Sequence, residues 1–452
     1  MTVRLRSGRG RGLLLATVLG SGLAFLDSTA VNVALPVLER ELHAGMSGLQ
    51  WTVDAYLLTL TALLLLGGSL GDALGHRKTF VAGVAWFALA SAACGLAPSI
   101  GALVAARAVQ GVGAALLIPG SLAVLRSSFA DEEQGRAIGA WAGLSGVTTA
   151  LGPLLGGWLI TAWSWRVVFF LNLPVAAGAI WLGLRCIPES KSPGQARLDF
   201  TGTLAATLGL GGAVYSLIEA PARGPGVLPA GAVGVALLAA FLWIEARRPD
   251  PMLPLELFRS RQFSGANAVT LAVYFALSGA TFLLVLHLQR VLGYSPFEAG
   301  AALTPITLLM LFLSPLAGEL TKRIGYRAPM TAGPLIAAGG VALLAGAGRG
   351  SSYVGGLLPG IAVVGFGLAT TVAPLTTAVL AGAEERHAGI AAAVNTAVAR
   401  LAGLLAVALL PLLAGIAAAD AGSLAAGFPR AMWICAAVSA AGGVCSLLTL
   451  RT

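Results

Sequence analysis

Hydrophobic residues lie in long runs along this chain, and short polar breaks separate one run from the next. A run of about 20 apolar residues is long enough to cross a bilayer as an α-helix. The pattern therefore predicts an all-α integral membrane protein with fourteen membrane-spanning helices. We place these helices at Leu13–Leu38, Trp51–Leu70, Thr79–Ala97, Gly101–Leu125, Arg136–Ile160, Arg166–Ile187, Thr201–Ile218, Gly226–Ile244, Ser264–Leu288, Phe297–Leu320, Tyr326–Ala347, Ser352–Leu380, Ala388–Gly415 and Phe428–Leu448.

The first apolar run follows a cluster of arginines, an arrangement that secretory signal peptides share. This run is too long for the apolar region of a signal peptide. It ends in Pro36 and charged residues rather than in a small-residue cleavage site. We therefore expect it to be a retained first helix.

Composition supports the membrane assignment. Hydrophobic residues make up 57% of the chain and charged residues only 10%, whereas soluble domains average about 25% charged. The net charge of +9 raises the possibility of nucleic-acid binding. With the N-terminus inside, however, 20 of the 28 Lys and Arg residues fall in cytoplasmic segments, 6 in outer segments and 2 within spans. This bias follows the positive-inside rule. It indicates that the basic residues meet a lipid bilayer rather than nucleic acid, and that both termini are cytoplasmic.

The chain contains 25 Arg but only 3 Lys residues and is rich in Gly and Ala. This composition is typical of a GC-rich bacterial genome. We therefore expect a multi-pass protein of a bacterial cell (inner or plasma) membrane.

Two segments of the chain match at an offset of 250 residues. The frame Gly-x-Leu-x-x-x-x-Gly-x-Arg begins at Gly68 and again at Gly318, each time between the second and third helices of a half. The repeat predicts two pseudo-symmetric six-helix halves, residues 1–190 and 263–452, joined by a linker with two extra helices, residues 191–262. Parallel repeats of this kind are typical of transporters, which bind their substrates near the membrane midplane.

Five short motifs follow one another along the chain in a consistent order. Together they resemble the major facilitator superfamily, and within it the fourteen-helix drug:proton antiporters. The motifs are Leu26-Asp27-x-Thr29-x-x-Asn32-x-Ala34-Leu35-Pro36, Gly68-x-Leu70-x-Asp72-x-x-Gly75-x-Arg77-Lys78, Arg107-x-x-Gln110-Gly111-x-Gly113, Gly152-Pro153-Leu154-Leu155-Gly156-Gly157, and Trp165-Arg166 with Phe169, Asn172 and Pro174.

The second motif connects two predicted helices on the cytoplasmic side. Gly71 and Gly75 would permit a tight reversal of the chain, and Asp72 lies close to Arg77 and Lys78. These charges could simply set the membrane topology. The resemblance implies a conformational latch that stabilises an outward-open state, formed by Gly68, Asp72, Gly75, Arg77 and Lys78. In the second copy Lys322 replaces the aspartate, which argues against a symmetric second latch.

The fourth motif lies in the fifth predicted helix. Pro153 cannot donate a helical hydrogen bond, so we expect it to break and flatten this helix. Small residues let a neighbouring helix approach closely, and close packing alone could explain the pattern. The resemblance implies that Gly152, Pro153, Gly156 and Gly157 mark a proton-coupled exporter.

Two charged residues lie inside predicted spans at similar depth. Asp27 and Arg107 both fall in the outer half of the membrane. A charge at the bilayer centre costs roughly 3 kcal/mol or more, so such residues usually pair and serve a function. One interpretation is a permanent ion pair. The other is that a proton binds Asp27, loosens the pair and shifts the conformational equilibrium.

Other polar residues within the spans are candidates for lining a substrate cavity. Asp54 lies near the outer surface, where it is either an entrance carboxylate or simply solvated. Arg400 lies near mid-membrane, where it either faces the cavity or pairs structurally. The complete set of candidates is Asn32, Asp54, Gln110, Trp141, Asn172, Asn395 and Arg400.

The sequence shows no constellation typical of an enzyme. The four His residues have no metal-ligand spacing, no Ser has a partnered His and acid, and a Walker-type phosphate loop is missing. We therefore expect neither metal nor cofactor, and a transporter driven by the proton gradient.

The favoured function is export of small amphipathic drugs or antibiotics by alternating access, by a protein that acts as a monomer. The scarcity of embedded carboxylates favours neutral, zwitterionic or weakly anionic substrates over dications. A facilitator or proton symporter for a metabolite is the alternative, and a receptor without transport is a third hypothesis.

Overall fold

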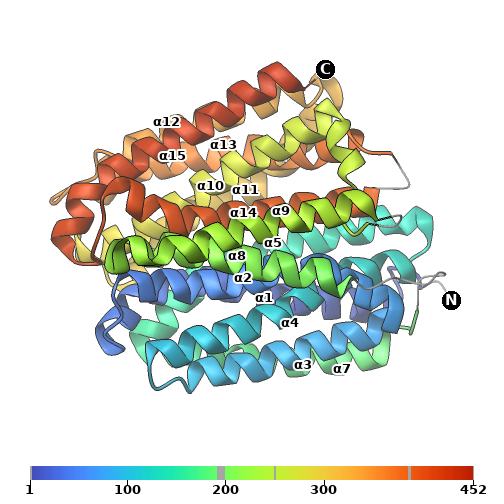
Figure 1. The fold of residues 1–452 in the computed structure, drawn as a ribbon. Helices are drawn as coiled ribbons and strands as arrows, with labels where there is room; N and C mark the ends of the chain where they lie inside the picture. The colour runs from blue at the N-terminus through green and yellow to red at the C-terminus, as the bar shows by residue number, and fades with distance from the viewer. Residues whose placement is uncertain (1–2, 191–198, 249–250, 385–387, 451–452) are drawn as a thin grey trace. The chain divides into compact units, whose positions relative to one another are not determined.

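The described chain is helical from end to end (Figure 1). The computed structural model describes residues 3–190, 199–248, 251–384 and 388–450. Its α-helices are α1 (Gly8–Glu41), α2 (Met46–Leu74), α3 (His76–Gly95), α4 (Ile100–Ser128), α5 (Asp131–Ala162), α6 (Trp165–Phe170), α7 (Asn172–Cys186), α8 (Phe200–Arg223), α9 (Leu228–Arg247), α10 (Arg261–Arg290), α11 (Pro296–Ile324), α12 (Arg327–Leu344), α13 (Leu358–Ala381), α14 (Ala388–Ala414) and α15 (Ala421–Thr449). Short 3-10 helices η1 (Gly224–Val227) and η2 (Leu255–Arg259) and a short π-helix η3 (Tyr353–Leu357) complete the described elements.

Twelve helical segments of the described chain are long and apolar enough to cross a membrane. One of them, Phe200–Arg247, contains both α8 and α9, and α12, with 18 residues, lies outside the twelve. The predicted all-helical membrane architecture is therefore confirmed. The count of fourteen crossings stays a prediction.

The chain divides into two compact units. Unit 1 comprises residues 1–44, 51–211 and 233–244, and unit 2 comprises residues 45–50, 212–232 and 245–452. The two extra helices α8 and α9 each contribute residues to both units. The division expected from the sequence, into residues 1–190, 191–262 and 263–452, stays a prediction.

The two units repeat one internal packing scheme. In unit 1, α1 packs on α4, α5 and α7, and α3 packs on α4 and α7. In unit 2, α10 packs on α13, α14 and α15, and α12 packs on α13 and α15. Helices α2 and α11 have the same bounds after a shift of 250 residues. The offset seen in the sequence is thus a repeat of structure.

Small residues allow this close packing at equivalent places. A Cβ atom at Gly83 would lie 2.9 Å from Cβ of Leu116 on α4, and one at Gly333 would lie 2.8 Å from the carbonyl oxygen of Gly367 on α13. Contacts that short would force the helices apart. Membrane helices associate through such close approach because lipid offers them no hydrophobic driving force.

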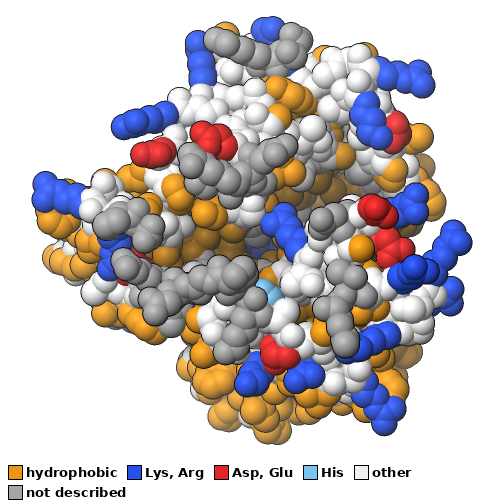
Figure 2. Space-filling view, turned by 90° about the vertical axis from the view of Figure 1, so that its right-hand side faces the viewer, with side chains coloured by type: hydrophobic (Ala, Val, Ile, Leu, Met, Phe, Trp, Pro, Cys, Tyr) orange, Lys and Arg blue, Asp and Glu red, His pale blue; other side chains and the backbone are white. Residues whose placement is uncertain are grey.

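Basic residues gather at one end of unit 1. Arg4 and Arg6, which precede α1, and Arg9 and Arg11 in its first turn are all exposed. Figure 2 looks onto the side at which the N-terminus lies, and Lys and Arg side chains are frequent there. This distribution agrees with the charge bias along the sequence, and the orientation of the termini in the membrane stays a prediction.

Candidate functional site

A buried ion pair lies at the centre of unit 1. The guanidinium of Arg107 on α4 donates to the Asp27 carboxylate on α1, and the two side chains are 1% and 0% exposed. Pairing of these residues was expected from their matching depth and is confirmed. Their role in proton coupling stays a prediction.

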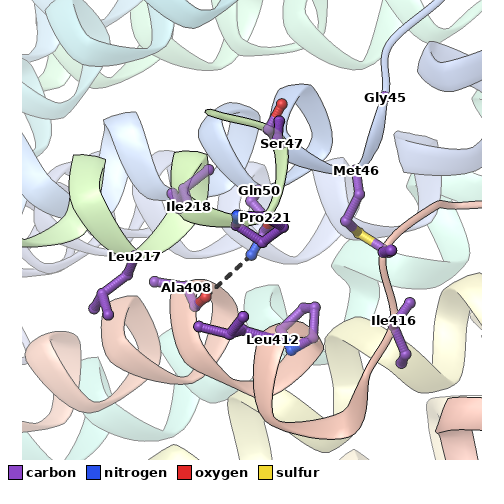
Figure 3. A pocket seen from close by; sticks show the side chains of 13 residues that line it. Gly45, Met46, Ser47, Gln50, Leu217, Ile218, Pro221, Ala408, Leu412 and Ile416 are labelled. Atoms are coloured by element: carbon purple, nitrogen blue, oxygen red, sulfur yellow. Dashed lines mark hydrogen bonds between the residues drawn. The ribbon is translucent and has the colours of Figure 1, made fainter. Parts of the chain in front are cut away.

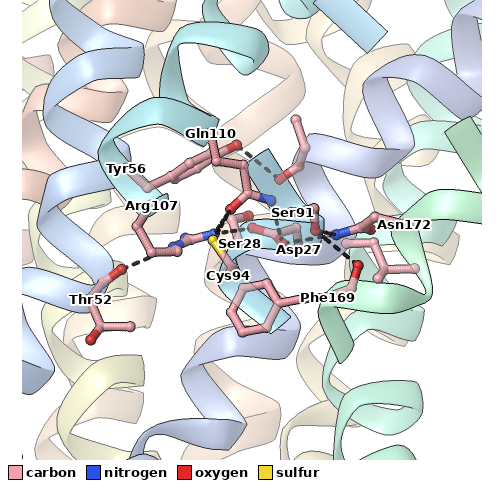
Figure 4. A network of polar contacts seen from close by, with 12 residues as sticks. Asp27, Ser28, Thr52, Tyr56, Ser91, Cys94, Arg107, Gln110, Phe169 and Asn172 are labelled. Carbon is pink, nitrogen blue, oxygen red and sulfur yellow. Dashed lines mark hydrogen bonds and ion pairs between the residues drawn. The ribbon is translucent and has the colours of Figure 1, made fainter. Parts of the chain in front are cut away.

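Two amides complete the shell of Asp27 (Figure 4). Gln110 Nε2 and Asn172 Nδ2 each donate to Asp27 Oδ1 at 3.0 Å. Gln110 Oε1 in turn accepts from Arg107 at 2.7 Å. Both amides are buried and support the ion pair. The expectation that these two residues line a substrate cavity stays a prediction.

Arg107 also reaches α2. Its Nε donates to the carbonyl oxygen of Thr52 at 3.1 Å, and its guanidinium lies 4.3 Å from the centre of the Tyr56 ring. A cation over an aromatic face is attracted by the ring quadrupole. The Asp27–Arg107 pair therefore holds α1, α4 and α2 together.

Two further residues in this cluster, Ser91 and Cys94, were not identified from the sequence. Ser91 accepts from Asn172 at 2.9 Å and donates to the carbonyl of Phe169 at 2.9 Å, and Cys94 lies 3.5 Å from Gln110. A serine or cysteine in an apolar run gives no signal of its own, because such residues are common in packed membrane helices. The cluster as a whole is balanced in charge and well supplied with donors, so it suits a conformational element rather than bond chemistry.

Of the two interpretations of Asp54, an entrance carboxylate or a solvated one, the solvated one is wrong. Asp54 lies on α2 and is 0% exposed, and neither carboxyl oxygen has a hydrogen-bond partner among the described residues. It is offset by two positions from Thr52 and from Tyr56, about 200° of rotation, so helical geometry turns it to the opposite face of α2 from Arg107. The carboxyl is buried apart from the ion pair.

The remaining cavity candidates are placed as follows. Asn32 is half-buried, and its Oδ1 has no hydrogen-bond partner among the described residues. Trp141 Nε1 donates to Ser21 Oγ at 3.2 Å, which ties α5 to α1. Asn395 and Arg400 lie in unit 2 on α14, and both are half-buried.

The second motif, Gly68 to Lys78, reverses the chain direction at a single glycine. Gly75 has a φ of 109°, in the region that favours glycine, and its equivalent Gly325 has a φ of 75°. Gly68 and Gly71 lie within α2, so the expected role of Gly71 in the reversal is wrong. The helix continues through Gly71 because the chain needs a positive φ only at the position that follows Leu74.

The partner of Arg77 comes from a distant part of the sequence. Arg77 Nε lies 3.5 Å from Glu189 Oε2, and the amide of His76 donates to the carbonyl of Ser190 at 2.9 Å. Asp72 lies 3.8 Å from His76, and Lys78 is exposed. The segment after α7 therefore packs on the loop between α2 and α3, which the sequence did not indicate.

Replacing Glu189 with glutamine is expected to slow transport severalfold without unfolding the protein. Both side chains of the pair are about one third exposed, so its loss costs about 0–1 kcal/mol of stability. Transport rate and melting temperature measure the two effects. The matched control is Glu319→Gln, which breaks the exposed Glu319–Lys322 pair near the second copy of the loop. Equal transport by both variants would exclude a special role for Glu189.

Helix α5 packs directly on α1 through its glycines. A Cβ at Gly152 would collide with Thr29, and one at Gly156 would lie 2.8 Å from Cβ of Ala30. Gly157 is buried, and its carbonyl accepts from Thr161 at 2.8 Å. The expected break at Pro153 is wrong, because α5 is continuous from Asp131 to Ala162. One missing donor is tolerated within a helix that its neighbour holds in place.

A second proline-containing helix shows how such a missing donor is compensated. Pro411 in α14 has no N–H, so the carbonyl of Val407, four residues earlier, has no helical partner. Gln50 Nε2 donates to this carbonyl at 2.7 Å and to that of Ala408 at 3.3 Å. Gln50 is 4% exposed and lies beside a pocket of about 210 Å³ in unit 2 (Figure 3), lined by apolar residues such as Met46, Ile218, Leu412 and Ile416.

Replacing Gln50 with leucine should destabilise unit 2. The buried carbonyl of Val407 would lose its donor, at a cost of about 1–3 kcal/mol. The melting temperature in detergent measures this. The double variant Gln50→Leu/Pro411→Ala restores a helical N–H and should recover most of the loss. A double variant no more stable than Gln50→Leu would contradict the explanation.

The described residues contain no group of three or more His, Cys, Asp or Glu side chains that could hold a metal ion.

Comparison with known proteins identifies the family of this chain. Residues 17–407 match the family described as Major Facilitator Superfamily. The chain is 38% identical over 391 residues to the multidrug resistance protein Stp of Mycobacterium tuberculosis, which covers 85% of this chain and 72% of that protein. It is 35% identical over 414 residues to the tetracenomycin C resistance and export protein of Streptomyces glaucescens, covering 90% and 76%.

The fold is also similar to a crystal structure of the peptide transporter POT in complex with sulfate. The TM-score is 0.73 at 14% sequence identity, and the match covers 99% of this chain and 96% of that one. At this identity the likeness concerns the fold alone.

Proposed function

The chain belongs to the Major Facilitator Superfamily, and from this premise we propose that it is a proton-coupled exporter of small amphipathic organic compounds such as drugs or antibiotics. It is a multi-span membrane protein, and its relatives are transporters named for drug resistance and export. The observation that supports proton coupling is a pair of buried carboxyl groups in the spans of unit 1, Asp27 with an ion partner and Asp54 without a hydrogen-bond partner among the described residues.

The two carboxyls suit different tasks in this mechanism. A charged carboxylate buried without a partner is costly, and the protonated form avoids that cost. We assign proton uptake to Asp54 for this reason. Asp27 already meets Arg107 and two amides, so a proton there would have to displace a complete set of donors.

The ion pair and Asp54 are linked through α2. Arg107 contacts the carbonyl of Thr52 and the ring of Tyr56, which flank Asp54 in the sequence at two residues on either side. When Asp54 gains or loses a proton, the free energy of burying α2 between Thr52 and Tyr56 changes. The Asp27–Arg107 pair can then pass the change to α1 and α4, which is the coupling that an alternating-access cycle requires.

We further propose fourteen membrane crossings with both termini cytoplasmic. The segment Phe200–Arg247 consists of two helices, which raises the twelve candidates to thirteen. Helix α12, at about 1.5 Å per residue, is about 27 Å long and nearly spans the hydrocarbon core. The charge bias supports cytoplasmic termini in a bacterial cell membrane, and the protein would act there as a monomer.

Everted membrane vesicles test the proposed export. In such vesicles an exporter moves its substrate into the lumen, and protons leave the lumen in exchange. We expect accumulation of an amphipathic dye when the lumen is made acidic, and loss of accumulation when a protonophore is added. Accumulation that is unaffected by the gradient would exclude proton coupling and favour a facilitator.

A further inference from the structure

Helices α1 and α7 of unit 1 pack against each other through two glycines. A Cβ at Gly12 would lie 2.5 Å from Cys186 Sγ, and one at Gly178 would lie 3.8 Å from Leu19 Cδ1. The contact partner moves back along α7 as α1 advances, so the two helices are antiparallel. The first turn of α1 therefore lies beside the last turn of α7.

An arginine ties the two helix ends together on one side of this seam. Arg9 precedes Gly12 by three residues, so it is turned about 60° forward around α1 from the contact. Its Nε donates to the carbonyl oxygen of Cys186 at 3.1 Å. This carbonyl belongs to the last residue of α7 and has no donor within the helix. Arg9 therefore serves the fold.

The other side of the seam carries two more arginines. Relative to the α1 glycine in the contact, Arg11 lies about 100° back around the helix and Leu15 about 60° back. On α7, Leu182 faces the same glycine at 3.8 Å. Relative to Leu182, Trp181 lies about 100° back and Arg185 about 60° back. Because the helices are antiparallel, these equal offsets turn all four side chains to the same side.

All four of these side chains are exposed. Arg11 lies in the first turn of α1 and Arg185 in the last turn of α7, whereas Leu15, 47% exposed, and Trp181, 54% exposed, lie about one turn deeper in the unit. The guanidinium of Arg185 lies 4.6 Å from the centre of the Trp181 ring. Tryptophan is enriched where headgroups meet the hydrocarbon of a membrane. The arrangement therefore suits that boundary.

The two arginines have no acidic partner among the described residues. Arg185 contacts the Trp181 ring, and the described chain gives the Arg11 side chain neither a hydrogen bond nor an ion pair. A guanidinium stays protonated in proteins, so this face of the seam is positively charged. Each guanidinium can donate two parallel hydrogen bonds to a phosphate group.

We propose that this side of the α1–α7 seam binds an anionic phospholipid of the leaflet in which the first turn of α1 lies. The headgroup phosphate meets Arg11 and Arg185, and an acyl chain runs past Trp181 and Leu15 into the membrane. A lipid fits this face better than a soluble phosphate, because apolar side chains lie directly below the two charges. The site is independent of which compound the protein exports.

Lipid binding to purified, delipidated full-length protein in detergent tests the site. Phosphatidylglycerol and phosphatidylcholine with the same acyl chains are titrated separately, and native mass spectrometry measures the fraction of protein that retains one lipid. We expect wild type to prefer phosphatidylglycerol. A basic side chain near a headgroup contributes about fivefold, so Arg11→Gln/Arg185→Gln should weaken phosphatidylglycerol binding about 30-fold. Phosphatidylcholine binding should change little.

Arg126→Gln is the matched control. Arg126 is exposed in the last turn of α4. The carbonyl of Ser128 nearby accepts from the amide of Val3 at 2.8 Å, which places Arg126 at the same end of unit 1 as the start of α1. This variant removes the same charge away from the seam and should leave phosphatidylglycerol binding unchanged.

Two further measurements keep the test decisive. Arg11→Lys/Arg185→Lys keeps both charges but not the planar forks, so we expect intermediate phosphatidylglycerol affinity, and this variant decides the matter if the glutamine variant does not fold. Inorganic phosphate at millimolar concentration distinguishes a lipid site from a site for a free anion. We expect it not to displace phosphatidylglycerol.

Several results would overturn the site. These are equal binding of the two lipids by wild type, an unchanged phosphatidylglycerol affinity in Arg11→Gln/Arg185→Gln, and the same loss of affinity in Arg126→Gln. Equal weakening of both lipids in Arg11→Lys/Arg185→Lys, or displacement of phosphatidylglycerol by inorganic phosphate, would also contradict it.

Discussion

Replacing Arg107 with leucine is expected to reduce the yield of folded protein sharply. Asp27 would remain as a buried carboxylate without its ion partner, and removing one member of a buried pair typically costs about 3–5 kcal/mol. That is a large part of the roughly 5–15 kcal/mol by which proteins are stable. The amount of monodisperse protein and its melting temperature in detergent measure the effect.

A double variant separates folding from function. Asp27→Leu/Arg107→Leu removes both charges, and replacement of a buried pair by apolar residues is often neutral for stability. We expect this variant to fold and to transport nothing, because the link between α1, α4 and α2 is gone. A stable single Arg107→Leu variant would contradict the structural argument. Full transport by the double variant would show that the pair is only structural.

Replacing Asp54 with asparagine should leave the protein folded but uncouple it from the proton gradient. Asparagine has nearly the shape of the protonated acid, so the buried position is satisfied without a charge. Gradient-driven dye accumulation is expected to fall about 100-fold or more, in the range that a positioned proton-transfer group contributes. Dye exchange at equal pH on both sides should continue.

Asp54→Glu is the matched control for this prediction. It keeps a titratable carboxyl on α2 one carbon further from the backbone, and we expect it to retain part of the gradient-driven activity. Full gradient-driven accumulation by Asp54→Asn would assign the proton elsewhere. Asp27→Asn would then be the next variant to measure.

The sequence predicted features that depend on position along a helix. The depth of Asp27 and of Arg107 follows from counting residues, and their pairing is confirmed. The match at an offset of 250 residues predicted a repeat. The glycine of each copy, Gly75 and Gly325, has a positive φ, which explains why glycine stands at both positions.

Features that depend on which way a helix faces could not be predicted. Asp54 lies near the start of α2, and only the rotation of that helix decides that it is buried rather than solvated. Glu189 and Gln50 find their partners in distant segments, and nothing in the sequence marks those pairs. The continuity of α5 through Pro153 likewise depends on α1, which packs against the glycines beside it.

The central claim, that export is exchanged for protons through Asp54, is tested most directly by measuring both fluxes on purified protein in liposomes. Dye movement and the pH of the lumen would be followed together after a dye gradient is imposed. The account predicts that wild-type protein moves protons against the dye, and that Asp54→Asn exchanges dye with no proton movement. Dye transport by wild-type protein without any proton movement, or unchanged proton movement in Asp54→Asn, would contradict it.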